Sequence, residues 1–401
     1  MGTLDQRLVA TVKHAYDHAP AFRQIMDQAN LTPADIQGVG DLHRIPITSK
    51  DALVQMQQQN PPFGGWLAVP LESLQRIYIS PGPLYDPYGA NDNEIIAPAV
   101  QAFQANGFAP GDRVLNTFLY HMVPAGLLID EALRALKTVV VPTGPGGTEA
   151  QIKVMMDLNV NAYVGTPSFL AMICDKAAEM GLSADKLPLE KAFFTAEPYP
   201  PSLRQRFEHG YGLQTAQAYA TADLGFVAYE RAGVEGMLIP DNLIVEVADA
   251  DTGAAQPDGE VGEVVVTTFS SAYPLIRFGT GDLGVMASDP KRLMGLVGRS
   301  GEAVKVRGMF LHPNQIKLVV QAFPQIKRTA AIVTRPENRD VLTLQIELAD
   351  DHGLSNTDEF AAVVMQAIHE KGRLRVDTVK FVQAGEIDPE ERMIRDERHW
   401  D

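Results

Sequence analysis

The sequence predicts an α/β protein. We expect a large N-terminal domain, with parallel sheets covered by helices plus a β-rich subdomain, and a small mobile α+β C-terminal domain. A chain of 401 residues is too long for one ordinary core. Strand and helix patterns alternate over residues 114–208, and strands with turns dominate from 236. The expected domains are therefore 1–298, with the β-rich part at about 236–298, and 299–401.

The alternating region predicts a parallel sheet, because strands joined by helices of this length run in the same direction. The predicted strands are 75–80, 114–119, 138–142, 162–165 and 191–195, and the predicted helices are 95–106, 126–136, 149–158, 168–180 and 201–208. Before them, Leu4, Leu8 and Val12 recur at helical spacing, and Ser49 is suited to cap a helix that follows.

The remaining segments have shorter elements. Strands are predicted at 243–247 and 262–268, and the C-terminal part has predicted helices at 314–321 and 358–371 with strands at 342–348 and 378–382. The domain boundary is expected at Arg299–Gly301, where glycine allows the backbone to swivel.

Composition excludes several classes of protein. No apolar run reaches the roughly 18 residues that a membrane helix requires, so no membrane partner is expected. The polar N-terminus does not resemble a secretory signal, and a cytoplasmic location is the expectation. A net charge of −16 argues against a nucleic-acid partner. The single cysteine, Cys174, lies in an apolar run and predicts a buried thiol, so no zinc is expected.

The segment from Leu275 to Ile316 contains four motifs in order: TGD, GRSG, KVRG and FLHPNQI. Asp282 follows a glycine turn at which we expect a strand to end, and its carboxylate can accept hydrogen bonds from two vicinal hydroxyls. Arg299 places a cation beside the expected swivel. The alternative is a glycine-turned hairpin with a surface Asp and Arg.

The order and spacing of these motifs resemble the adenylate-forming (AMP-binding) superfamily, and most closely the phenylacetate–CoA ligase family. Further segments resemble that family along nearly the whole chain: GPGGTEAQ at 144–151, TPSF at 166–169, TAEPY at 195–199 and YATAD at 219–223.

The resemblance implies a role for individual residues. Ala196, Glu197 and Pro198 would line the adenine, and Tyr219 would stack on it. Asp282 would hold the ribose, Arg299 would support the ribose or a phosphate, and Asp223 would hold Mg²⁺. The KVRG match adds Lys305 and Arg307 to the cofactor-binding residues. Two alternatives remain open: Tyr219 as an ordinary core residue, and Glu197 as an acceptor of backbone hydrogen bonds.

Two segments depart from the family pattern. Where relatives have a glycine- and threonine-rich phosphate loop ending in lysine, this chain reads SPGPLYDP from Ser80 to Pro87, with Asp86 at the lysine position. Near the C-terminus, Arg392 replaces the lysine expected to act in adenylation.

Three functions are consistent with these motifs. The first is an acyl- or aryl-CoA ligase that uses ATP with Mg²⁺, forms AMP and transfers the acyl group to CoA. The second is an ATP-independent acyltransferase or thioesterase, which acts from CoA onto an acyl-carrier protein or another acceptor, with His121 as candidate base. The third is a non-catalytic paralogue that binds a nucleotide or a CoA ester. A homodimer is a possible assembly, and Phe118, Tyr120 and Met122 are candidates for the substrate wall.

Overall fold

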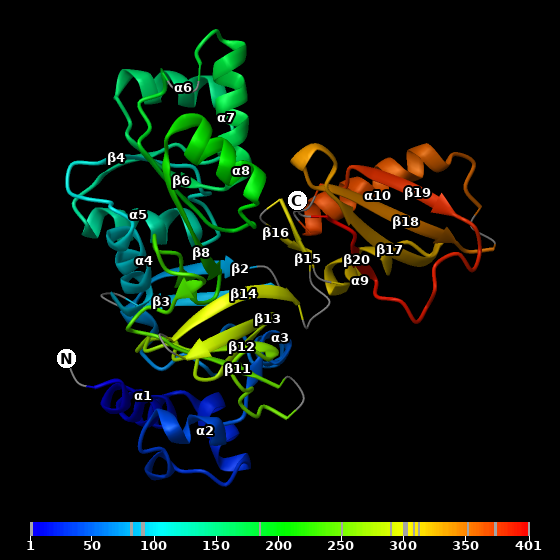
Figure 1. Ribbon diagram of the computed structural model, residues 1–401. Coiled ribbons are helices and arrows are strands. Elements are labelled where there is room, and N and C mark those ends of the chain that lie inside the picture. Colours follow the sequence, from blue (N-terminus) through cyan, green and yellow to red (C-terminus); the bar gives the residue numbers. More distant parts are fainter. Residues whose placement is uncertain are drawn as a thin grey trace. The chain divides into compact units, whose positions relative to one another are not determined.

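The computed structural model describes residues 3–80, 83–89, 93–183, 186–249, 252–288, 291–299, 304–307, 309–311, 313–350, 353–372 and 375–399. The chain forms two compact units, residues 1–300 and 301–401 (Figure 1). No helix in the described ranges is long and apolar enough to cross a membrane.

One mixed sheet runs through the first unit. In spatial order its strands are β11 (Ile244–Ala248), β12 (Val261–Thr267), β13 (Phe278–Ser288), β14 (Lys291–Arg299), β10 (Met237–Leu238), β9 (Gly225–Tyr229), β8 (Gln214–Thr221), β7 (Lys191–Phe194), β6 (Ala162–Gly165), β4 (Arg113–Asn116) and β5 (Val139–Pro142). Strands β8 to β5 are parallel, and the pairs from β11 to β8 are antiparallel. The predicted parallel sheet is confirmed for β4, β5, β6 and β7, and the β-rich part continues it. The predicted strand 75–80 does not belong to it, because it pairs antiparallel in a separate two-stranded sheet.

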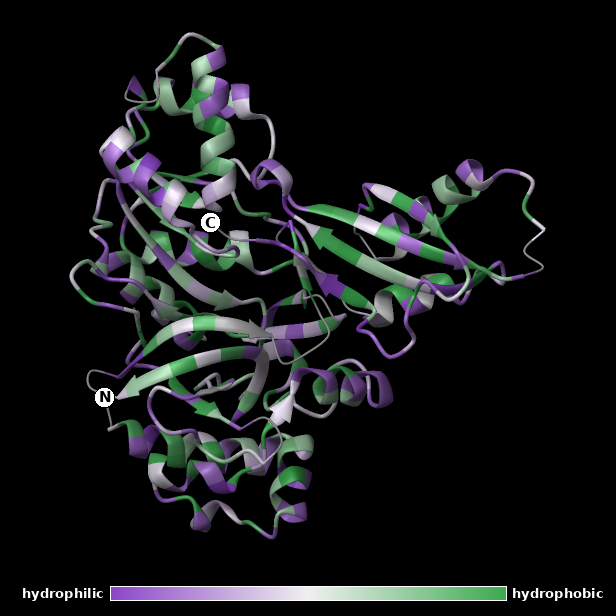
Figure 2. Cartoon of the chain, turned by 45° about the vertical axis from the view of Figure 1, so that its right-hand side comes forward, coloured by the Kyte–Doolittle hydropathy of each residue, from purple (hydrophilic) through white to green (hydrophobic). Residues whose placement is uncertain are grey.

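Helices cover both faces of the parallel strands (Figure 1). One side carries α4 (Asn93–Ala105) and α5 (Ala125–Ala135), and the other carries α6 (Thr148–Asp157), α7 (Pro167–Glu179) and α8 (Pro201–Gln205). Successive strand residues point to opposite faces, so Phe193 packs with α4 and α5, and Phe194 packs with α7 and α8. Cys174 is buried in the second layer, where burial raises the pKa of its thiol to about 12. Green and purple bands alternate around these helices, as helices with one buried side require (Figure 2).

The N-terminal helices α1 (Leu4–His18), α2 (Pro20–Gln28) and α3 (Lys50–Gln59) pack at the antiparallel end. The short strand β1 (Thr48–Ser49) lies parallel to the start of β13 and precedes α3, which Ser49 caps through the Ala52 N–H. The fully buried Arg277 holds the segment that leads into β1, because its guanidinium donates to the backbone oxygens of His43 and Ile45. The same guanidinium donates to the Gly253 oxygen and pairs with Glu246 at 3.1 Å.

The SPGPLYDP segment does not form a phosphate loop. It folds as a hairpin of β2 (Leu74–Ser80) and β3 (Leu84–Gly89), with Ser80 opposite Leu84. Residues 81 and 82, at the turn, lie outside the described residues. Pro83, which has a fixed φ and no N–H, directly precedes β3, and four consecutive residues of that return strand, 86–89, are buried. Asp86 therefore lies within a strand, with its side chain buried.

Other boundaries also differ from the prediction. β13 continues through Thr280-Gly281-Asp282, where the sequence predicted a strand end, because β12 and β14 pair with it on both sides. The strand predicted at 114–119 ends at Asn116, whose amide then bonds Tyr120 and Gly126. Strands β8 and β9 were not predicted. The helix predicted at 201–208 ends its α-helical part at Gln205 and continues as a π-helical turn to Gly210.

The second unit is a sheet covered by two helices. Its strands are β19 (Thr378–Val382), β18 (Val341–Leu348), β17 (Ile326–Thr334) and β20 (Ile394–Asp396) in spatial order, its helices are α9 (Pro313–Val320) and α10 (Thr357–Gly372), and a small hairpin joins β15 (Val304–Val306) to β16 (Met309–Leu311). An apolar core that includes Ile346 and Val364 lies between the helices and the sheet.

Candidate functional site

Tyr219 and Asp282 form a buried pair in the first unit. The Tyr219 hydroxyl donates a 2.7 Å hydrogen bond to Asp282 Oδ2, and the two residues are 7% and 8% exposed. Asp282 is held further by its own backbone N–H, which donates to the Thr280 hydroxyl. The structure thus brings together two residues that the motifs assign to the adenine and the ribose.

The 195–198 segment lies beside this pair. It leaves the carboxyl end of β7, next to β8, and the Thr195 hydroxyl donates to the carbonyl oxygen of Ala218, the neighbour of Tyr219. Ala196 has a left-handed backbone with φ of 78°. Such turns at the carboxyl ends of parallel strands form the ligand crevice in open α/β sheets.

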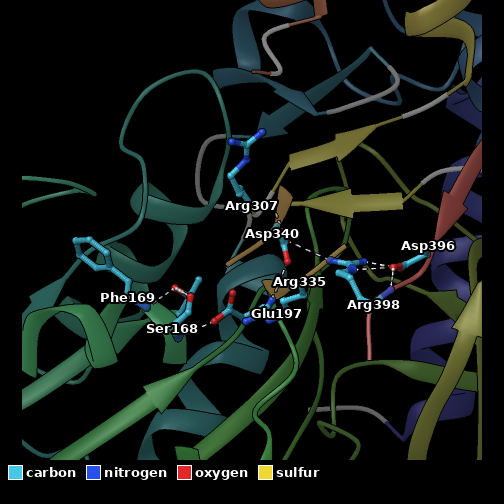
Figure 3. Close-up of polar contacts among 9 residues, drawn as sticks. Ser168, Phe169, Glu197, Arg307, Arg335, Asp340, Asp396 and Arg398 are labelled. Carbon is cyan, nitrogen blue, oxygen red and sulfur yellow. Dashed lines mark hydrogen bonds and ion pairs between the residues drawn. The ribbon is translucent and has the colours of Figure 1, made fainter. Parts of the chain in front are cut away.

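Glu197 has a structural contact of its own. Its carboxylate accepts the backbone N–H of Ser168 at 2.7 Å, at the start of α7 (Figure 3). The first N–H groups of a helix have no partner within the helix, and a carboxylate there also interacts favourably with the helix dipole. Glu197 therefore ties the turn after β7 to α7, in keeping with the backbone-acceptor alternative, while Pro198 is exposed.

The remaining predicted site residues are not part of the Tyr219–Asp282 pair. In the β13–β14 register Arg299 lies directly opposite Asp282; its side chain, like that of Lys305 in β15, is outside the described side chains. Arg392 and His121 are both exposed.

Arg307 belongs to an ion-pair network of the second unit. Its guanidinium pairs with Asp377 at 3.0 Å and bonds the Arg375 carbonyl. Its backbone N–H donates to Asp340 at 2.8 Å (Figure 3). Asp340 also accepts from Arg335 and Arg398. In this structure the Arg307 side chain is engaged in holding its own unit together.

Asp223 lies in a buried polar cluster with Lys50 and Ser80. The Lys50 ammonium contacts both carboxylate oxygens of Asp223, at 2.8 and 3.1 Å, and the Ser80 hydroxyl donates to Oδ1 at 3.1 Å. The Asp223 side chain is only 2% exposed, and that of Lys50 is 24% exposed. We call Lys50, Ser80, Asp86 and Asp223 the acid–lysine cluster.

Asp86 is the second carboxyl group of this cluster. Neither of its oxygens has a hydrogen-bond partner among the residues that the structure describes. Burial, and then the charge of Asp223, raise the pKa of Asp86 to about 8, against smaller lowering effects of Ser80 and Lys50. Asp86 is therefore predominantly neutral at pH 7, and the repulsion of a phosphate expected from a charged aspartate is weakened.

The predicted Mg²⁺ site does not fit these contacts. An ammonium already spans the two oxygens of Asp223 through which a carboxylate binds a metal. Within the described ranges, no three His, Cys, Asp or Glu side chains gather in a way that would hold a metal ion. A metal ion at Asp223 would have to displace the Lys50 ammonium.

Sequence reasoning missed Lys50 and Gln57. Both lie on α3, and a spacing of seven residues puts them on one face of the helix. Gln57 exchanges hydrogen bonds with the backbone N–H and C=O of Tyr85 in β3, so the face that carries Lys50 docks on the hairpin that carries Asp86. The local sequence signal for this face was the spacing of Lys50 and Gln57, which lie two helical turns apart.

Known proteins resemble this chain over most of its length. The AMP-binding enzyme family matches residues 93–272. A phenylacetate-coenzyme A ligase of Thermus thermophilus is 30% identical over 364 residues, covering 86% of this chain and 81% of the relative. That of Escherichia coli is 28% identical over 400 residues, covering 95% and 90%.

Solved structures agree in fold. A 2-hydroxyisobutyryl-CoA ligase in complex with 2-HIB-AMP and CoA superposes with a TM-score of 0.90 at 22% identity, over 98% of this chain and 90% of that one. Together with the ordered motifs, these relatives confirm the resemblance seen in the sequence: the chain belongs to the phenylacetate–coenzyme A ligase family of AMP-binding enzymes.

Proposed function

We propose that this chain is an AMP-forming ligase that activates an acyl or aryl carboxylate as its adenylate and transfers the acyl group to CoA. The observation that carries the proposal is the Tyr219–Asp282 pair beside the turn after β7. A planar ring next to a buried carboxylate suits a purine nucleoside, whose ribose hydroxyls donate to that carboxylate. Relatives named as phenylacetate-coenzyme A ligases support an aryl acid as the substrate to try first.

Each residue has a part in the proposed reaction. Ala196 and Pro198 would contact the adenine, Asp282 would hold the ribose, and Arg299, opposite Asp282 in the sheet, would support the ribose or a phosphate. The family motifs assign Lys305 and Arg307 to cofactor binding, and Arg392 would supply positive charge during adenylation. CoA then displaces AMP from the acyl carbon.

The test is release of AMP and pyrophosphate from ATP with a panel of aryl and fatty carboxylates, with and without CoA. Asp282→Asn removes the charge that accepts the ribose hydroxyls and should lower kcat/KM for ATP about 10- to 100-fold. Glu235→Gln, at an exposed position, is the matched control and should leave turnover unchanged. An unchanged rate in the Asp282 variant would remove the nucleoside role.

A second candidate rests on the hairpin that replaces the phosphate loop. A hairpin in which Pro83 precedes β3 and Asp86 is buried offers a triphosphate fewer N–H donors than a glycine-rich loop does. The alternative activity is transfer or hydrolysis of an acyl group from CoA, with an acyl-carrier protein as one acceptor and His121 as base. This activity would be favoured over the ligase if ATP gave no AMP or pyrophosphate, while the chain consumed an aryl-CoA at a rate that His121→Ala reduces.

We also propose an assembly and a location for the chain. A homodimer is tested by light scattering of the purified chain. The cytoplasm, with its pools of ATP and CoA, is the proposed location, and fractionation of cells that express the chain tests it.

A further inference from the structure

The acid–lysine cluster is built from segments far apart in the sequence. Lys50 starts α3, Ser80 ends β2, Asp86 lies in β3 and Asp223 follows β8. Pairing of β1 with β13 fixes the start of α3, and the Gln57 bonds to Tyr85 fix the helix against the hairpin. The ammonium is thus delivered to the two oxygens of Asp223 by a rigid element.

The charges of the cluster balance only with Lys50 in place. Asp223 is buried, and a buried carboxylate without a cation or several donors is strongly unfavourable. Lys50 supplies one positive charge and Ser80 one hydrogen bond, while Asp86 adds two carboxyl oxygens that have no partner among the described residues. The cluster therefore has the oxygen donors of a cation site, and the cation that lies among them is the Lys50 ammonium.

We propose that the Lys50 ammonium is the resident cation of this cluster and occupies the position at Asp223 that a protein-bound divalent metal would take. This role rests on the proposed function, in which Mg²⁺ would enter only as its complex with a nucleotide and Asp223 would hold no metal. Lys50 is then a positioning residue, which keeps the Asp223 carboxylate fixed and neutralised beside the hairpin.

The proposal predicts how the cluster responds to metal when the lysine is removed. Lys50→Ala leaves Asp223, Asp86 and the Ser80 hydroxyl without their cation, and hard oxygen donors of this kind suit Mn²⁺ and Mg²⁺. Lys50→Arg keeps the charge and should leave the cluster closed to metal. Lys13→Ala is the matched control, since it frees the carboxylate of Asp17 at an exposed ion pair.

The experiment is a titration of Mn²⁺ into the full chain, followed by electron paramagnetic resonance of the free ion, without nucleotide, carboxylate or CoA. The wild type, Lys50→Arg and Lys13→Ala should show only weak, non-saturating binding. Lys50→Ala should gain one saturable site at least tenfold tighter, and the double variant Lys50→Ala, Asp223→Asn should lose it.

Two results would overturn the proposal: one saturable Mn²⁺ per wild-type chain that Asp223→Asn abolishes, or a folded Lys50→Ala variant that gains no site. Should circular dichroism show that Lys50→Ala does not fold, the wild type and Asp223→Asn still decide the question. Because no substrate is present, the outcome is independent of whether the chain activates a carboxylate.

Discussion

The Tyr219 hydroxyl and the Asp282 carboxylate are joined by a 2.7 Å hydrogen bond between β8 and β13, although β14, β10 and β9 lie between those strands in the sheet. The two positions that the motifs assign to different parts of a nucleoside are therefore one mechanical unit. A change at either residue alters the position or the charge of the other.

Tyr219→Phe tests that unit. It keeps the ring and removes the donor, which leaves the buried Asp282 with one hydrogen bond fewer and should lower the free energy of unfolding by about 1–3 kcal/mol. Urea unfolding followed by fluorescence measures the difference. Tyr85→Phe, on a ring that is 42% exposed, is the control and should change stability little. Equal stability of the Tyr219 variant and the wild type would mean that the pair contributes nothing net.

Asp86→Asn tests the neutral buried acid. An unfolded aspartate ionises near pH 4, whereas the pKa of Asp86 in the fold is about 8, so between these values the folded chain binds the extra proton. This group therefore lowers the free energy of unfolding by about 1.4 kcal/mol for each unit of rising pH in that window. The contribution of Asp86 to folding is complete below pH 4 and is lost as the pH rises to 8.

The Asn variant lacks that titration. Its stability relative to the wild type should rise steadily from pH 5 to pH 7.5, when unfolding by urea is measured at each pH. Glu235→Gln, at an exposed position, gives the baseline slope. Parallel curves for the Asp86 variant and the wild type would show that Asp86 is ionised in the fold.

Arg277→Met tests the anchor of the N-terminal segment. It removes three bonds to backbone oxygens and leaves Glu246 without its buried guanidinium, so the free energy of unfolding should fall by roughly 3–5 kcal/mol. Hydrogen exchange should rise in residues 43–49, which lead to Lys50. Arg231→Met, at an exposed site, should change stability by less than about 0.5 kcal/mol. Unchanged protection of 43–49 would contradict the anchoring role.

Asp340→Asn tests the network of the second unit. Asp340 accepts from the Arg307 backbone and from the guanidinium groups of Arg335 and Arg398, whose side chains are 4% and 8% exposed. Weakened pairing of two buried cations should destabilise this unit by several kcal/mol. Hydrogen exchange of the full chain should increase in β17, β18 and β20 and stay unchanged in the first unit. Glu390→Gln, at an exposed position, is the control. Equal protection in both variants would show that the network does not stabilise this unit.

The hairpin shows where sequence reasoning failed. QRIYIS was predicted as a strand from its alternation, and the following SPGPLYDP was assigned by its position in the family pattern as a damaged loop. Its return strand was missed because Pro87 lowers strand propensity, while pairing with β2 and the Gln57 bonds, both made by distant residues, stabilise it. TGD likewise contains a glycine that favours a strand end, and neighbouring strands override that preference.

The sequence alone determined the family, the alternating strands and helices of the parallel region, and which residues are candidates for the nucleoside site, because these depend on local spacing and residue type. Only the tertiary structure decided the contacts and the charge of the hairpin that replaces the phosphate loop. Lys50 and Asp223, 173 residues apart, meet through the pairing of β1 with β13, and burial rather than residue type makes Asp86 neutral. Burial and long-range charge are properties of the packed fold, and local spacing does not record them.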